Sequence, residues 1–206
     1  NQVRVPPNSD LEHLCLHHCT LVPGRSLNLE SEPGSPALPS LIIESPNVSV
    51  EIEQCILGGL RVVEGAIVKI NNSIVDATDE TSVSYAALDG EAPGGVLEVI
   101  NSTIIGKVHS RRLELASNTI FKAALLEADS WTAPVLSEQK QSGCVRFSYV
   151  PPGAMVPRRY RCQPDLAIEK AIKDAEQYGV SLLDAEKQQI TSWIKKQIQP
   201  VFTDHR

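Results

Sequence analysis

A short pattern returns five times along the chain, and a repeat constrains the architecture more than any single motif does. Each copy has apolar residues at its first, third and eighth positions, and Cys or a small polar residue at its sixth. The copies are Leu14–Leu21, Val50–Leu57, Val68–Val75, Leu97–Ile104 and Leu113–Ile120. Their starts are 36, 18, 29 and 16 residues apart. Because one turn of a solenoid takes roughly 20 residues or more, the short steps predict bare turns. The long steps predict turns with insertions or, for the step of 36 residues, two turns.

The spacing inside each copy predicts strands with one buried face. Residues two apart lie on the same side of a strand, so the first and third positions face a core and the charged residue between them faces water. The sixth position is predicted to be a bend whose small side chain turns inward and stacks in a column, and its members are Cys19, Cys55, Ser73, Ser102 and Asn118. We therefore expect a mainly β fold, a right-handed parallel β-helix followed by two C-terminal α-helices. An antiparallel β-sandwich is the alternative, but the hairpin dipeptides that it needs are missing between the copies.

Composition divides the chain into two parts. Residues 1–164 are predicted to form the β-helix domain, with inserted loops at the Pro-rich segment 22–47 and at the acidic segment 76–95. Residues 165–206 are predicted to be a helical cap or docking segment. Further strands are expected at 41–43, 58–63 and Cys144–Val150.

Two helices are expected in the C-terminal part. Apolar residues at helical spacing follow Asp165, the predicted N-cap, and Gly179 is the predicted terminator. Ser181 and Asp184 form a capping-box pattern for a second helix, which Pro200 ends. Because both helices are amphipathic, they must cap the open end of the solenoid, pack on each other, or dock onto another protein.

Charge and cysteine content narrow the function classes. A net charge of −6 gives no electrostatic case for binding nucleic acid, and no apolar run approaches the roughly 20 residues of a membrane span.

The cysteine content bears on the compartment. Five cysteines, an odd number, favour a reducing compartment and hence a cytoplasmic assembly, while the sequence leaves undecided whether Cys144 and Cys162 form a disulfide. The chain begins with Asn rather than Met, which indicates a processed or excised piece of a longer protein.

One cluster has metal-ligand character. His13, Cys15 and His17 share the outward face of a predicted strand, and their side chains suit zinc or copper. Neighbours two apart on a strand are about 6–7 Å apart, however, which is wide for one tetrahedral ion. A solvated histidine face is the simpler interpretation, and we expect no metal and no cofactor, since the phosphate-loop and dinucleotide motifs are absent.

A second cluster would suit acid–base chemistry on a polysaccharide. Asp76 and Asp79 lie in the acidic insertion, and Lys107, His109 and Arg111 supply cations on the following turns. General acid–base catalysis needs such groups at a fixed separation in one cleft. No second acidic pair recurs one turn later, so solvation of a loop explains the same charges, and catalysis is the less favoured interpretation.

A third motif is basic and aromatic. Arg158, Arg159, Tyr160 and Arg161 precede the first predicted helix, and arginines there can bind carbonyls and carboxylates to join the two parts of the chain. With Trp193 of the second predicted helix, these residues are the candidate interaction residues.

Several segments carry a resemblance to a known group of proteins. Gln141–Gly153, Pro157–Pro164, Asn72–Ala77 and Ala116–Phe121 resemble segments of uncharacterised bacterial proteins that contain a β-helix-like segment. The likeness covers about residues 11–164, and those proteins continue past the point where this chain ends. The resemblance implies an association with phage-tail-like contractile-injection gene sets. It implies no activity and assigns no catalytic residue.

These observations favour a non-enzymatic structural or interaction module, a rigid β-helix scaffold within a larger assembly. Its partners would be other protein subunits or the remainder of a longer chain. A carbohydrate-binding or polysaccharide-cleaving β-helix is the main alternative, and an adhesin-like surface protein is a third.

Overall fold

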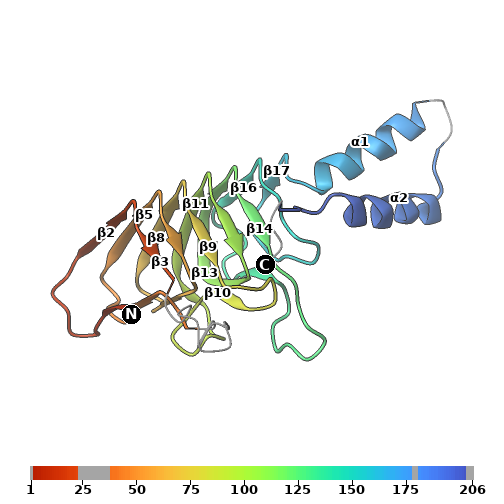
Figure 1. The fold of residues 1–206 in the computed structure, drawn as a ribbon. Helices are drawn as coiled ribbons and strands as arrows, with labels where there is room; N and C mark the ends of the chain where they lie inside the picture. The colour runs from red at the N-terminus through yellow and green to blue at the C-terminus, as the bar shows by residue number, and fades with distance from the viewer. Residues whose placement is uncertain (1, 23–37, 178–180, 203–206) are drawn as a thin grey trace, which may run out of the picture.

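In a computed structural model that describes residues 2–22, 38–177 and 181–202, the chain is mainly β. Parallel strands build a curled sheet, and two α-helices follow at its C-terminal end (Figure 1). This confirms the predicted mainly β architecture, the parallel pairing and the two C-terminal helices. Residues 23–37 of the first predicted insertion and the predicted helix terminator Gly179 lie outside the described residues.

The named strands fall into three rows, in which every pairing is parallel. The first row, here the β5 row, stacks equal positions of the repeat, so that Ile52 lies opposite Ile70 and Ile70 opposite Val99. Its members are β2 (His13–His17), β5 (Ser49–Glu53), β8 (Ile67–Asn71), β11 (Gly94–Ile100), the later part of β13 (Lys107–Ser117), β16 (Cys144–Arg146) and β17 (Arg159–Tyr160).

From β2 to β13, the chain leaves each strand of the β5 row through a sharp bend and continues into two further rows of shorter strands. The β6 row contains β3 (Thr20–Leu21), β6 (Ile56–Leu57), β9 (Ile74–Asp76), β12 (Thr103–Ile105) and β14 (Ile120–Lys122). The β7 row contains β1 (Val3–Val5), β4 (Leu41–Ile43), β7 (Leu60–Val62), β10 (Val83–Ala86), the early part of β13 and β15 (Val135–Ser137). Because β13 continues from the β7 row into the β5 row, these two rows form one curled sheet.

The core lies between the rows and is aliphatic. Val50 and Ile52 point inward and are buried, whereas Glu51 between them is exposed and lies 3.7 Å from Lys69 on the next strand. Leu57 of the β6 row and Leu60 of the β7 row complete the same layer. Burial of each such side chain stabilises the fold by about 1.5–3 kcal/mol, which makes this alternation the main determinant of the strands.

The bends between the β5 and β6 rows share one backbone conformation. A residue with a φ between 48° and 53° stands at each bend, in the left-handed region that Asn tolerates better than most residues. The residue that follows turns inward and joins a hydrogen-bonded column. The backbone N–H of Cys55 donates to Ser73 Oγ at 3.0 Å, and that of Ser73 donates to Ser102 Oγ at 3.0 Å. The predicted inward column is thus confirmed for Cys19, Cys55, Ser73 and Ser102.

For Asn118 the prediction is wrong, because β13 contains a β-bulge. Leu113 lies opposite Leu97, but the next pair joins Leu115 to Glu98, so the strand holds one extra residue. The fifth copy of the repeat is therefore shifted by one position. Thr119 is the buried residue of the bend, whereas Asn118 is exposed and donates from Nδ2 to Asn101 Oδ1 at 3.2 Å.

The second predicted insertion is shorter than expected. Segment 76–95 contains β10, which lies between β7 and β13 and buries Tyr85 in the core. The insertion was predicted as a loop because its acidic residues mask the strand pattern of Val83–Ala86. The strands expected at 41–43 and 58–63 are confirmed as β4 and β7. The expected strand Cys144–Val150 ends early, at Arg146, because the next residue adopts the left-handed bend.

The two helices form a hairpin that extends beyond β17 (Figure 1). Helix α1 spans Asp165–Glu176 and helix α2 spans Asp184–Gln197. The predicted starts are displaced: Pro164, not Asp165, is the N-cap of α1, and α2 begins after Leu183, whose N–H is capped by the Glu186 carboxylate at 2.8 Å. The helices pack on each other, and Ile194 is their one buried residue.

Candidate functional site

Lys107 and His109, two of the predicted acid–base residues, lie together on the outward side of β13. Both are nevertheless buried, because the segment around Asp129 and Trp131 covers them. Lys107 Nζ lies 2.6 Å from Asp129 Oδ1 and 5.1 Å from the centre of the Trp131 ring. The lysine hydrogen bond, with that from the Leu126 N–H, lowers the pKa of the Asp129 carboxyl. The ammonium group is thus held as half of an ion pair under an aromatic ring.

His109 connects two other segments to the same strand. Its Nδ1 lies 2.6 Å from the Glu91 carbonyl oxygen, and its Nε2 lies 2.8 Å from Glu138 Oε1. The ring also meets Trp131 edge-on, at 5.2 Å between ring centres. Both hydrogen-bonding partners are acceptors, so the ring satisfies both only when each nitrogen carries hydrogen. These contacts hold loops in place and leave neither nitrogen directed at an open cleft.

The other three acid–base candidates contact different groups. Asp76 is buried at the end of β9 and accepts a hydrogen bond from the Thr78 N–H at 2.8 Å. Asp79 is exposed and accepts from the N–H and hydroxyl of Thr81, which lower the pKa of its carboxyl. Arg111 forms an exposed ion pair with Glu64 at 2.7 Å.

The metal candidates share the exposed face of β2, as the alternation predicts. His13, Cys15 and His17 are all exposed, and His17 Nδ1 lies 3.2 Å from Glu53 Oε2. Among the described residues, no group of three or more His, Cys, Asp or Glu side chains is arranged to hold a metal ion. All five cysteines are free thiols, Cys144 and Cys162 included.

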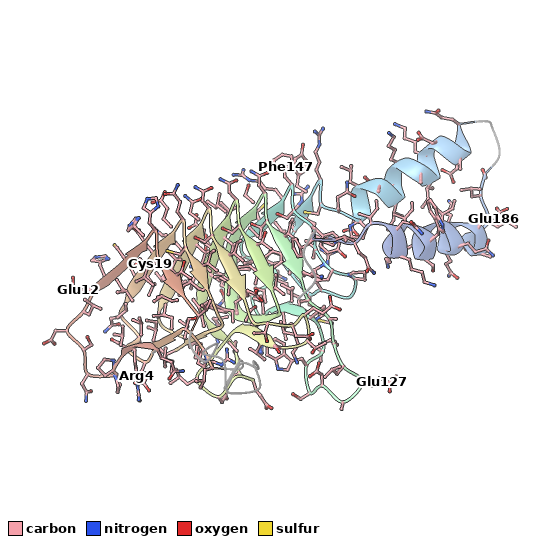
Figure 2. The ribbon with its side chains drawn as sticks, in the orientation of Figure 1. Arg4, Glu12, Cys19, Glu127, Phe147 and Glu186 are labelled. Carbon is pink, nitrogen blue, oxygen red and sulfur yellow. The ribbon has the colours of Figure 1, made fainter. Side chains whose placement is uncertain are left out.

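The basic and aromatic motif lies at the junction of the strands and the hairpin. Arg159 donates to Asp165 Oδ2 at 3.0 Å and to the Ala154 carbonyl at 2.7 Å, so it makes the predicted connection between β17 and α1. Tyr160 packs edge-on against Phe147 at 5.6 Å, and the Arg161 guanidinium lies 5.5 Å from the Tyr160 ring. Arg158 is exposed. Figure 2 shows Phe147 at the edge of the sheet nearest the helices.

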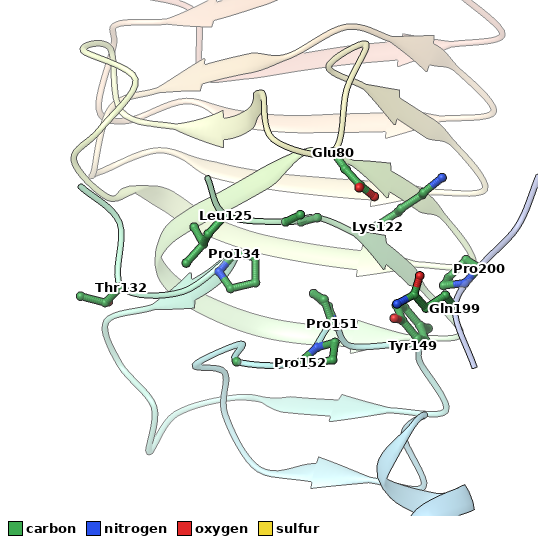
Figure 3. A pocket seen from close by; sticks show the side chains of 13 residues that line it. Glu80, Lys122, Leu125, Thr132, Pro134, Tyr149, Pro151, Pro152, Gln199 and Pro200 are labelled. Atoms are coloured by element: carbon green, nitrogen blue, oxygen red, sulfur yellow. The ribbon is translucent and has the colours of Figure 1, made fainter. Parts of the chain in front are cut away.

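A groove of about 320 Å³ lies beside β14, and the sequence did not predict it (Figure 3). Its polar side chains are those of Glu80, Lys122, Thr132, Tyr149 and Gln199, and four prolines line part of the remainder. Burial, with a contribution from the Glu80 charge, raises the pKa of Tyr149. The lining residues come from five separate segments, so no local motif signals the groove, and none of the five acid–base candidates lines it.

The hairpin exposes large apolar side chains. Trp193 is 64% exposed and Leu183 70% exposed, values far above those of the core. Ala185, Gln189 and Trp193 follow one another at intervals of four residues, so they share one face of α2. That face forms a shallow groove together with Lys196.

Neither described helix has the length and apolar content that crossing a membrane requires. Comparison of the chain with protein-family models, with curated proteins and with solved structures finds no match.

Proposed function

We propose that the curled sheet closes into a right-handed parallel β-helix, and that the chain is a rigid, non-enzymatic scaffold within a larger protein assembly. The constant order in which the chain passes from the β5 row to the β6 row and the β7 row supports the β-helix. The proposed hand follows from the strong preference for right-handed crossovers between parallel strands.

One observation carries the scaffold function: the hairpin extends from the sheet with a tryptophan and a leucine in solvent. Exposed Trp is a frequent anchor of protein interfaces, where its burial contributes a large share of the binding energy. Trp193 with Ala185 forms a helical face that fits an apolar groove on a partner subunit. The hairpin is accordingly the docking element, and the partner supplies the groove.

The ion pairs formed by the predicted acid–base residues also favour a scaffold over an enzyme. Lys107, His109 and Arg111 are engaged with Asp129, Glu138 and Glu64 of the chain itself. Such ion pairs fix loops against strands, and the groups are not directed at a shared reacting atom. We propose the assembly to be phage-tail-like, on the resemblance of the segments between residues 11 and 164.

The docking proposal is tested by affinity purification of the protein from its native host, with mass spectrometry of the co-purifying proteins. Replacing Trp193 by Ala removes the anchor without touching the core. We expect tail-tube, sheath or baseplate-like proteins with the wild type, and at least tenfold less of them with Trp193→Ala.

The matched control is Leu126→Ala, which removes a side chain of similar exposure, 57%, from the loop that carries Asp129. This variant should retain the wild-type set of partners. If Trp193→Ala recovers as much of the partner proteins as the wild type does, docking through the hairpin is contradicted. It is also contradicted if the wild type purifies without any partner protein.

A saccharide-binding function is the second candidate, and the groove of Figure 3 is the observation that favours it. Its volume is within the range of ligand pockets, which starts near 300 Å³. Glu80 and Gln199 offer hydrogen-bond acceptors and donors for sugar hydroxyls, and Tyr149 adds an aromatic side chain to the lining. This candidate uses the groove rather than Asp76 and Arg111.

We expect Glu80→Gln to weaken any glycan binding about tenfold, since a hydrogen bond to a charged group contributes about 1.5 kcal/mol or more. Binding is measured on a glycan array and then by calorimetry. Glu127→Gln, an exposed change in a nearby loop, is the control. If the wild type binds no glycan on the array, the saccharide candidate is rejected.

A further inference from the structure

Within the described residues, no further strand lies beyond the end of the sheet opposite the hairpin, and this end is here called the open edge. β1, β2 and β3 are the last strands of the β7, β5 and β6 rows, and within the described part of the chain each pairs with a single neighbour. Figure 2 shows Glu12 and Cys19 at this end, farthest from the helices. Such an edge presents unpaired backbone N–H and C=O groups, which favour pairing with another strand.

The apolar layer at this edge is also incomplete. Leu14 and Leu16 point inward from β2 but remain partly exposed, whereas Val50 and Ile52, which lie opposite them on β5, are buried to 1% exposure or less. Leu21 of β3 is partly exposed in the same way, above the buried Leu57. A further layer on this end would bury these leucines.

The sequence of β2 identifies what fits there, because His-Leu-Cys-Leu-His is a palindrome centred on Cys15. An antiparallel second copy of β2, related by a two-fold axis at Cys15, places His13 opposite His17 and Leu14 opposite Leu16. Leucines then meet leucines on the inner face, as an isologous interface requires. The flanks also match, since Glu12 comes opposite His18 of the second copy, a charge-complementary pair when the histidine is protonated.

The direction of the backbone groups agrees with this axis. Glu12 O accepts from the Ser49 N–H, and the His18 N–H donates to Glu53 O, so the even-numbered residues bond to β5. In a parallel ladder the N–H and C=O groups of the intervening residues, Cys15 among them, therefore point to the open edge. An antiparallel pair centred on Cys15 needs those same groups.

We propose that two copies of this chain associate through their β2 edges, antiparallel and two-fold symmetric about Cys15. The interface buries the leucines of the open edge and pairs the backbone groups of β2 that point away from β5. It is distinct from the hairpin, which lies at the other end of the sheet and stays available to its own partner.

The first test is the mass of the 206-residue chain by light scattering and sedimentation at about 50 μM, a concentration at which a micromolar dimer is largely formed. We expect twice the chain mass of 22.4 kDa. Cys15→Pro removes the central N–H, which faces away from β5, and should give a folded monomer, whereas Cys15→Ser keeps that N–H and should remain a dimer. A monomeric wild type would overturn the proposal, as would a Cys15→Pro dimer.

The second test does not depend on the proline variant. Hydrogen-bonded antiparallel pairs have Cα atoms about 5.5 Å apart, within the range that a disulfide bridges. Diamide, which takes two electrons and two protons from a pair of thiols, should therefore link Cys15 to Cys15 of the second copy. Cys144→Ser should leave the cross-link unchanged and Cys15→Ser should abolish it. A cross-link mapped to another cysteine would contradict the two-fold axis.

Discussion

Replacement of Ile70 by Asp should prevent the chain from folding. Ile70 is one of the two inward residues of β8, lies between Ile52 and Val99, and is 2% exposed. An aspartate there is buried without a partner, and neither its charged nor its neutral form has a hydrogen bond to replace those of water. We expect a loss of about 4 kcal/mol or more, enough to abolish a cooperative urea transition followed by circular dichroism. Val50→Asp and Val99→Asp should behave alike.

The matched control makes the same substitution on the same strand. Ile67 begins β8 and is 41% exposed, so Ile67→Asp keeps its carboxylate in water. It should cost less than about 1 kcal/mol, as surface substitutions usually do. A soluble Ile70→Asp protein with a wild-type transition would show that the inward face of β8 is wrongly assigned.

The contrast between inward Ile70 and outward Ile67 explains why so much of the fold was predictable from sequence. Strand alternation is a local property, and Val50, Glu51 and Ile52 carry it without reference to the remainder of the chain. Because stacked copies bury equal positions, the repeat also predicted that its copies stack on one another. The same argument identified the inward bend residues Cys55 and Ser73.

The predictions failed where a distant contact decides the local structure. The extra residue of the bulge near Glu114 is evident only from the pairing of β13 with β11. Without that pairing, Asn118 was predicted as the inward bend residue in place of Thr119. The strand Val83–Ala86 depends on β7 and β13 on either side of it, while its own sequence is short and flanked by acidic loops.

The candidate sites were less predictable than the fold, for the same reason. Lys107 and His109 were predicted as acid–base candidates from their residue types alone, and the sequence could not reveal that the segment around Trp131 covers them. The groove of Figure 3 gathers Glu80, Lys122 and Gln199 from segments far apart in the chain.

The second large effect is expected at the ion pair under Trp131. In Asp129→Ala the Lys107 ammonium stays buried without its carboxylate, which should destabilise the fold by about 3 kcal/mol. Lys107→Met removes the buried charge and keeps an unbranched chain in the same space, so it should cost about 1 kcal/mol. The double variant should be more stable than Asp129→Ala alone. Equal costs for the two single variants in urea unfolding would contradict this account of the pair.

The pH dependence of the unfolding free energy shows whether Asp129 stabilises the fold through its charge or through its packing. The hydrogen bond from Lys107 lowers the pKa of Asp129 in the folded chain, so folding favours the charged carboxylate. Its stabilisation is fully present above the carboxyl's unfolded pKa of about 3.9, and is lost as the pH falls through the lower, folded value. The stability gap between the wild type and Asp129→Ala should therefore be constant from pH 7 to pH 5 and narrow below about pH 4. A gap of the same size at pH 3 as at pH 7 would mean that Asp129 acts through its packing, because only the charged form of the carboxylate gains from the lysine.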